Sequence, residues 1–132
     1  YVTVFRQVGS DQQESWQSLT ESQQRKMAMV IDMWTSAATE NHAGAQSQLG
    51  NIYYAGHGVA QDRQTAAQWF QKAANQGHGG AQYNLGCMYR DGDGVAQDHK
   101  KAVHWFRIAA DQGYVHAQNN LGDMYDSGLG VA

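Results

Sequence analysis

Apolar residues recur along this chain at helical spacing, and the pattern repeats every 36 residues. In the first complete copy, Ala45, Leu49, Ile52 and Tyr53 are three, four or one positions apart, which places them on one face of a helix. A second set with the same kind of spacing comprises Ala66, Trp69, Phe70, Ala73 and Ala74. The pattern therefore predicts two amphipathic helices in each copy, over about 45–55 and 62–76.

Turn and cap residues separate the two predicted helices. Gly56 and Gly58 suit a turn that needs positive φ near a helix end. Asp62 stands where an N-cap belongs, and Gly77 follows the second helix. The next copy repeats these signals at Asp98, Ala102, Trp105, Phe106, Ala109, Ala110 and Gly113.

The repeats determine the predicted fold class and domain organisation. Residues 45–80 and 81–116 align without a gap and are identical at half of their positions, and a third copy, 117–132, stops after its first helix. Each unit of such an array buries its apolar face only by stacking on its neighbours. We therefore predict an all-α protein, an α/α solenoid of stacked helical hairpins.

The N-terminal residues 1–44 are less regular and are predicted to form a tail and a helical cap. A shift of one period aligns Met33 and Trp34 with Trp69 and Phe70, which indicates a degenerate second helix of a preceding repeat. A solenoid needs an atypical terminal unit to cover its first apolar face. This segment suits that purpose.

Three segments are expected within the N-terminal part of the chain. Thr20 and Gln23 form a capping box for a helix over about 21–41, whose inward side carries Met27, Val30, Ile31 and Trp34. Ahead of it, residues 9–19 can form a short helix bearing Trp16, and residues 1–5 are expected to be an extended tail.

Glycine and aromatic residues at equivalent repeat positions point to packing rather than to binding. A glycine in a helix interior costs about 1 kcal/mol relative to alanine unless a neighbouring element approaches closely, so close helix contacts are expected at Gly50, Gly86 and Gly122. A stripe of aromatic residues at equivalent positions is expected to form core between repeats, and comprises Tyr53, Tyr89, Tyr125, Trp69 and Trp105.

The repeated residues follow the string A-x-x-x-L-G-x-x-Y-x-x-G-x-G-V-x-x-D-x-x-x-A-x-x-W-F-x-x-A-A-x-x-G. This string resembles the Sel1-like repeat, a relative of the tetratricopeptide repeat, and the resemblance covers residues 45–132. It implies an α/α solenoid used mainly to assemble protein complexes, often in bacteria. Some proteins of this kind have been linked to β-lactam or cell-wall binding. The resemblance permits this function, but no residue of this chain requires it.

Similarity to tetratricopeptide arrays implies that the first helix of each hairpin lines the concave side. Positions that vary between repeats are free to bind, and residues one period apart become neighbours at roughly 8 to 10 Å. The resulting candidate partner-binding residues are Ser47, Asn51, Tyr54, Tyr83, Cys87, Arg90, Asp91, Asn119, Asp123 and Asp126, with Ala55 and Ser127 beside them. They suit an extended protein or peptide segment, and the alternative is that they are merely solvated.

Composition and charge limit the kind of partner that the chain can bind, but they do not indicate its cellular compartment. A net charge of −3 with only nine Lys plus Arg argues against a nucleic-acid surface. No stretch approaches the roughly 18 apolar residues of a membrane span. The single Cys87 excludes an intrachain disulfide and fits either cytoplasm or periplasm. The chain begins at Tyr1 rather than Met, which indicates a processed or cut protein.

The residues with chemical potential have plainer interpretations. No two of the six histidines have the spacing of a helical metal-ligand pair with a third ligand near, and HExxH is absent. The segment 91–94 lacks the further acidic ligands of a calcium loop. Cys87 near Arg90 is a possible nucleophile, but a small residue at a variable position is the better interpretation. No metal or cofactor is predicted.

The predicted function is a non-enzymatic scaffold that binds a protein or peptide through the concave face. One alternative is an immunity or antitoxin protein that neutralises a bacterial effector, and another is a cell-wall or β-lactam-binding enzyme. Because the third copy stops after its first helix, an apolar face is expected there, and end-to-end association through it is possible.

Overall fold

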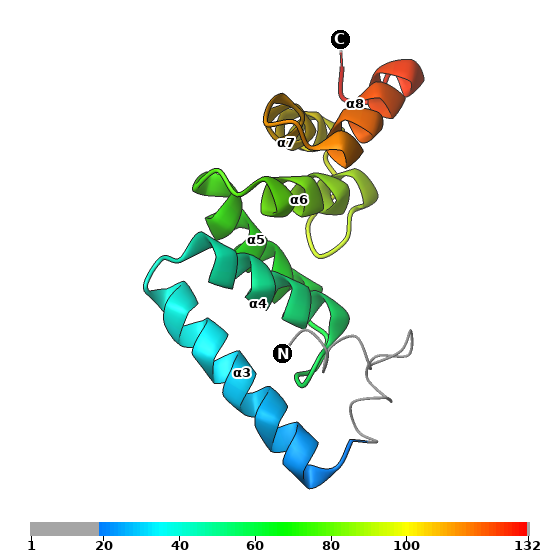
Figure 1. Ribbon diagram of the computed structural model, residues 1–132. Helices are drawn as coiled ribbons and strands as arrows, with labels where there is room; N and C mark the ends of the chain where they lie inside the picture. The colour runs from blue at the N-terminus through cyan, green and yellow to red at the C-terminus, as the bar shows by residue number, and fades with distance from the viewer. Residues whose placement is uncertain (1–18, 132) are drawn as a thin grey trace.

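The computed structural model describes residues 19–131, which form an all-α solenoid as predicted. Helical hairpins stack into an elongated array with α3 at one end and α8 at the other (Figure 1). The helices of the described range are α3 (Glu21–Thr39), α4 (Ala43–Ala55), α5 (Arg63–Asn75), α6 (Gly79–Asp91), α7 (His99–Asp111) and α8 (Val115–Ser127). The expected tail over 1–5 and nearly all of the expected short helix over 9–19 lie outside the described residues.

Side-chain caps begin α3, α5 and α7 where the sequence predicts them. The Thr20 Oγ1 accepts the backbone N–H of Gln23 at 3.2 Å, and the Gln23 side chain accepts the backbone N–H of Thr20 at 2.9 Å. Asp62 and Asp98 each accept the backbone N–H three residues later, at 3.1 Å. These bonds satisfy donors that have no partner inside the helix. The capping box at α3 is confirmed.

Histidines cap the first helices of two repeats. The Nδ1 of His42 accepts the backbone N–H of Ala45 at 3.1 Å, and His78 makes the same bond to Ala81. Tyr114 occupies the equivalent position before α8 and makes no side-chain cap. All three first helices, α4, α6 and α8, begin two residues before the predicted boundaries, so the earlier start does not depend on the histidine cap.

The mid-helix glycines make room for phenylalanine rings. A Cβ built on Gly50 would lie 2.5 Å from a ring carbon of Phe70, and one on Gly86 would lie 2.7 Å from Phe106. The expected close contact is thus found at both glycines, and it is made by an aromatic ring. A Cβ on Gly122 meets no atom within 4 Å, because no described helix follows α8.

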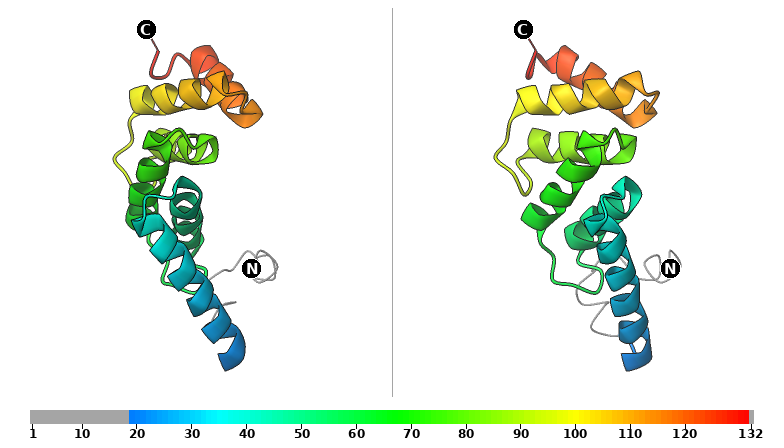
Figure 2. Two further views of the ribbon diagram at one scale, coloured as in Figure 1. Left: turned by 60° about the vertical axis from the view of Figure 1, so that its left-hand side comes forward. Right: turned by 90° about the vertical axis from the view of Figure 1, so that its left-hand side faces the viewer.

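The repeated aromatic residues lie mostly in the core between repeats, as expected. Tyr53, Tyr89, Trp69 and Trp105 are partly buried and pack against the core clusters. Tyr125 differs, since it is 50% exposed on α8. The views in Figure 2 show why, because the helices of successive hairpins cover one another along the stack and α8 is the last of them.

Buried glutamines connect the repeats by a ladder of hydrogen bonds. Gln46 and Gln82 are each only 2% exposed. The Nε2 of Gln82 donates to the carbonyl of Ala74 at 3.2 Å, and its Oε1 accepts from the Nε2 of Gln112 at 2.8 Å. Gln76 donates to Gln46 in the same way one repeat earlier. Each buried amide is therefore satisfied, as a buried polar group must be.

Candidate functional site

A hollow of about 230 Å³ opens between the first helices α4 and α6. Asn51, Tyr54, Cys87 and Asp91 line it, and all four belong to the candidate partner-binding residues predicted from the sequence. The remaining lining residues are Phe70, Asn84, Met88 and Asp93. The side chains of one period thus meet those of the next across a common depression.

Two carboxamides in the hollow make no hydrogen bond within residues 19–131. These are Asn51 on α4 and Asn84 on α6. Asn120, which is one period after Asn84, instead donates to the Sγ of Cys87 at 3.7 Å. Each free carboxamide offers two donors and an acceptor oxygen. The hollow between α4 and α6 therefore presents hydrogen-bonding groups that the described part of the chain does not use.

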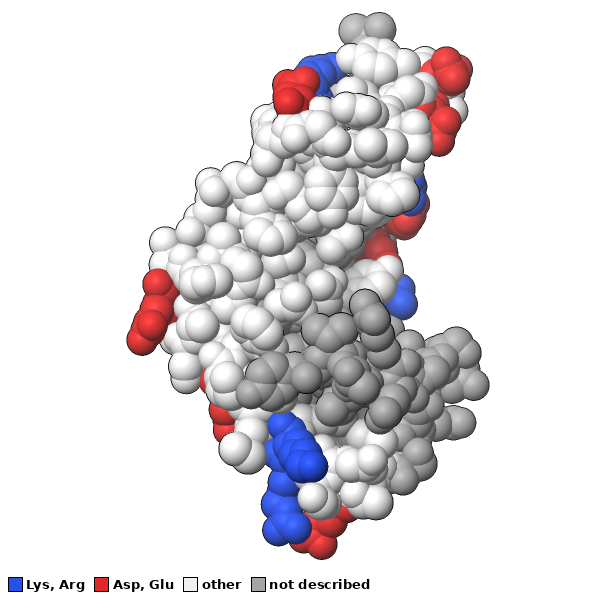
Figure 3. Space-filling view, viewed as in Figure 1, with Lys and Arg blue, Asp and Glu red and all other residues white. Residues whose placement is uncertain are grey.

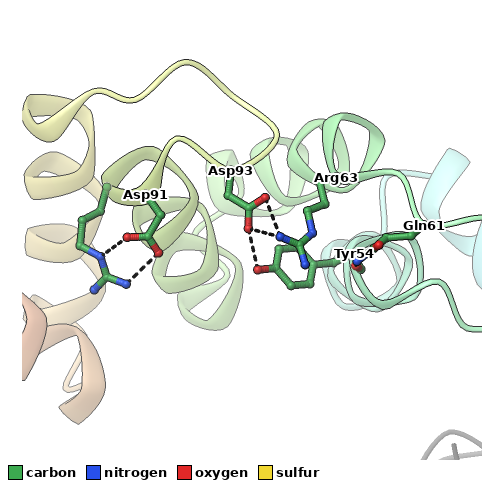
Figure 4. Close-up of polar contacts among 6 residues, drawn as sticks. Tyr54, Gln61, Arg63, Asp91 and Asp93 are labelled. Carbon is green, nitrogen blue, oxygen red and sulfur yellow. Dashed lines mark hydrogen bonds and ion pairs between the residues drawn. The ribbon is translucent and has the colours of Figure 1, made fainter. Parts of the chain in front are cut away.

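Tyr54 is held at the rim by a carboxylate of the next repeat. Its hydroxyl donates to the Oδ2 of Asp93 at 2.7 Å, and the Nη1 of Arg63 lies 2.8 and 2.9 Å from the two oxygens of that carboxylate (Figure 4). The guanidinium of Arg63 also lies 4.5 Å from the centre of the Tyr54 ring. Burial, followed by the hydrogen bond to Asp93, raises the pKa of Tyr54.

A glycine turn brings Asp93 to this position. Gly92 and Gly94 have φ values of 68° and 76°, which glycine adopts without steric cost. A Cβ on Gly94 would collide with the backbone carbonyl of Arg63. The turn therefore lies directly against the first residue of α5, and this contact places the carboxylate beside the guanidinium.

Asp91, the other carboxylate of the hollow, is paired with its chain neighbour. The Nε and Nη2 of Arg90 donate to its two oxygens at 2.8 and 3.0 Å, and this hydrogen bonding lowers the pKa of Asp91. The same guanidinium lies 5.9 Å from the centre of the Phe106 ring. Tyr54, which stands one period before Arg90, is bonded to Asp93 instead. Both carboxylates at the hollow are therefore compensated by an arginine.

Cys87 is a half-buried thiol rather than an activated nucleophile. Burial is the largest effect and raises its pKa, although hydrogen bonding to Tyr83 and the charge of Arg90 oppose it. The thiol therefore stays protonated near neutral pH. The charge of Arg90 favours the thiolate, but the effect of burial on the pKa of Cys87 is larger.

The remaining predicted residues do not join the hollow. Ser47 was expected to be exposed but is only 6% exposed, so its side chain is not available to a partner. Tyr83 packs within its own repeat, with its ring 5.7 Å from Tyr114 and 6.0 Å from Phe106. Three others are exposed on α8, outside the hollow: Asn119, Asp123 and Asp126.

Sequence reasoning missed four lining residues of the hollow. Phe70 and Met88 were assigned to packing or left aside, and both do belong to the core. Asn84 is not among the predicted residues, although its position also varies, with Gln48 one period earlier and Asn120 one period later. Asp93 was assigned to the turn. The signal for Asp93 was its change of residue type, since His57 stands one period earlier.

Charged side chains avoid the face formed by α4 and α6. Where grey atoms do not cover it, this face is almost entirely white in Figure 3, with Lys, Arg, Asp and Glu gathered along its edges and ends. Among residues 19–131, no group of three His, Cys, Asp or Glu side chains is placed to hold a metal ion. No helix in that range has the length and apolar character of a membrane span.

Comparison with known proteins identifies the repeat. The family model described as Sel1 repeat matches residues 43–78, 80–114 and 115–132. These matches cover more than half of the chain. No curated protein matches its sequence.

Two solved structures have the same architecture. A protective antigen present in uropathogenic Escherichia coli strains, which displays an SLR fold, is 43% identical over 77% of this chain, with a TM-score of 0.76. A Sel1 repeat protein from Oxalobacter formigenes is 29% identical over 85% of this chain, with a TM-score of 0.69. The chain spans 22% and 49% of the lengths of these two proteins.

Proposed function

The chain belongs to the Sel1 repeat family, and from that premise we propose that it is a non-enzymatic interaction module. Its binding site is the hollow between α4 and α6, and its ligand is an extended segment of another protein. The observation that carries the proposal is the pair of carboxamides of Asn51 and Asn84 on neighbouring first helices, which make no hydrogen bond to any residue that the structure describes. Carboxamides present donors and acceptors that match those of a peptide backbone.

The charges around the hollow favour an uncharged segment. Asp91 and Asp93 are each bonded to an arginine, so the rim offers little net charge to a ligand. Beyond these ion pairs, the visible part of the face of α4 and α6 shows almost no charged side chains (Figure 3). Tyr54 adds aromatic surface of the kind that anchors protein interfaces, whereas Phe70 is only 2% exposed and offers a ligand little contact. Recognition here rests on hydrogen bonds and apolar contact.

A peptide-display selection against the purified chain tests the proposal. The selected peptides are expected to be uncharged in the segment that binds, and their affinity should change little between low and high salt. The double variant Asn51→Ala/Asn84→Ala should weaken them by roughly tenfold or more, because several hydrogen bonds are lost.

The matched control is Asn120→Ala. This asparagine is one period after Asn84, and its carboxamide is already bonded to Cys87. It should leave peptide affinity unchanged. If the selected peptides bind the double variant as well as the unaltered chain, the hollow is not the binding site. Thermal unfolding of each variant shows that the fold is intact.

A further inference from the structure

The outer side of α7 carries three cations and a histidine. Lys100, Lys101, His104 and Arg107 are all exposed. Within residues 19–131 the ion pairs join Arg25 to Glu21, Arg63 to Asp93 and Arg90 to Asp91, so no carboxylate lies within 4.0 Å of the cations of α7. This local positive charge stands on a chain whose net charge is −3.

The fold does not require these charges. One period earlier, on α5, the positions equivalent to Lys100, His104 and Arg107 are all glutamine, namely Gln64, Gln68 and Gln71. The two helices occupy the same place in successive hairpins and have the same length. Neutral side chains therefore suffice at the equivalent positions of α5. On α7, Arg107 donates a hydrogen bond to the hydroxyl of Tyr125, whereas the side chains of Lys100 and His104 make no hydrogen bond or ion pair within residues 19–131.

A hollow of about 360 Å³ lies beside these cations. Lys100, His104 and Arg107 form its polar side, and Val103, Tyr125 and Val131 give it apolar surface. Cations next to an apolar depression suit a ligand that combines negative charge with an apolar side chain. Nucleic acid is less well matched, since it needs a broader basic surface to neutralise its phosphates.

The same hollow exists one repeat earlier, where a further hairpin follows. A depression of about 570 Å³ along α5 is lined by Gln64, Gln68 and Gln71 together with Tyr89 and Val95. Gln64 and Gln68 remain exposed there although α7 comes next in the stack. The open surface beside α7 is therefore a recurring feature of the repeat, and it does not depend on α8 being the last helix.

We propose that the basic outer face of α7 is a second docking site, which binds an acidic segment of a partner protein that also carries an apolar anchor. The cations pair with glutamate or aspartate, and the apolar residue enters the hollow at Val103 and Tyr125. This site is formed by a second helix and shares no residue with the hollow between α4 and α6. It therefore stands independently of the function proposed above.

The test uses the chain's own residues as replacements. A fluorescent peptide made of glutamates interspersed with leucines should bind the unaltered chain, with an affinity that falls as salt rises. The triple variant Lys100→Gln/His104→Gln/Arg107→Gln gives α7 the side chains of α5, so it should fold normally. It should bind the peptide roughly tenfold more weakly, because the charge pairs of Lys100 and Arg107 and a hydrogen bond from His104 are lost.

The reciprocal variant builds the site where it is absent. Gln64→Lys/Gln68→His/Gln71→Arg gives α5 the cations of α7, and it should raise the number of acidic peptides bound per chain. The variant Asn51→Ala/Asn84→Ala should bind the acidic peptide unchanged, which separates this proposal from the other site.

Four results would overturn the proposal. These are no binding of the acidic peptide, equal binding by the triple variant, equal binding of a peptide with glutamine in place of glutamate, and tighter binding of single-stranded DNA than of the acidic peptide.

Discussion

The hydroxyl of Tyr54 donates a 2.7 Å hydrogen bond to the Oδ2 of Asp93, which belongs to the next repeat. The same carboxylate accepts from Arg63, so one side chain of the second repeat holds two of the first. Leu129 stands one period after Asp93, so this polar junction is not repeated between the second and third copies. The contact is therefore a particular feature of the repeat boundary that carries the hollow.

Replacing Asp93 by asparagine should loosen this boundary. The charged bonds to Arg63 and Tyr54 are weakened, and because the pair is partly solvated we expect a loss of about 1 kcal/mol in unfolding free energy. Urea unfolding measures it. Asp91→Asn is the control, because that carboxylate bonds only to its chain neighbour Arg90 among described residues, and it should cost less. Equal losses would show that the bond across the repeats contributes no more to the unfolding free energy than the bond between chain neighbours.

The same substitution should move the ionisation of Tyr54. Burial is the first cause of its raised pKa, and the hydrogen bond to Asp93 and the charge of Asp93 raise it further, whereas Arg63 lowers it. Asp93→Asn removes the charge and keeps the burial. The pKa of Tyr54 should therefore fall, as followed by ultraviolet absorbance of the phenolate with Tyr54→Phe as the reference. A rise in the pKa of Tyr54 would contradict a hydrogen bond in which its hydroxyl donates to Asp93.

Alanine at the mid-helix glycines should have opposite effects in the first and third repeats. In Gly50→Ala the new methyl meets the Phe70 ring, so overpacking should cost about 1 to 3 kcal/mol. In Gly122→Ala nothing lies within 4 Å, so the higher helix propensity of alanine should stabilise this chain by about 0.5 to 1 kcal/mol. Thermal unfolding distinguishes them, and two changes of the same sign would refute the ring contact.

The fold could be predicted because the same helix and turn signals occur in each copy of the repeat. The apolar spacing, the turn glycines and the aspartate caps all recur, and each recurrence confirms the helix boundaries to within a few residues. The caps of α4 and α6 were missed, since histidine is not among the usual N-cap residues and nothing in its spacing signals that its Nδ1 accepts a backbone N–H. Rules based on the preferred N-cap residues therefore do not predict this contact.

The candidate site could be predicted only in part, because repeat alignment gives a position but not its surroundings. Asn51 and Tyr54 were identified from their variability, and both line the hollow. Ser47 satisfied the same criterion and is buried. Asp93 was missed because it enters from the turn of the following repeat, which a ladder of first-helix positions leaves out. Exposure depends on which neighbouring side chains are large, and the alignment of one position cannot show that.

The buried glutamine ladder provides a further pair of matched variants. Gln82→Leu removes bonds to Ala74 and Gln112 inside the core, so it should lower the unfolding free energy by about 1 to 3 kcal/mol. Gln118 makes the equivalent bond to the carbonyl of Ala110 but is exposed and has no following glutamine partner among described residues. Gln118→Leu should stay within about 0.5 kcal/mol of the unaltered chain. Urea unfolding measures both, and similar effects would mean that burial of the ladder does not matter.

His57 should make the stability of the first repeat depend on pH. Burial lowers its pKa below the ordinary value of 6.5, so the unfolded chain binds a proton more readily than the folded chain. The contribution of His57 to unfolding free energy is therefore complete above about pH 6.5 and is lost as the pH falls through its lowered folded pKa. His57→Leu, which copies Leu129 at the equivalent position of the third repeat, should give a flatter curve across this range. Urea unfolding of both proteins between about pH 8 and pH 5 tests this, and parallel curves would mean that the imidazole is not desolvated enough to matter.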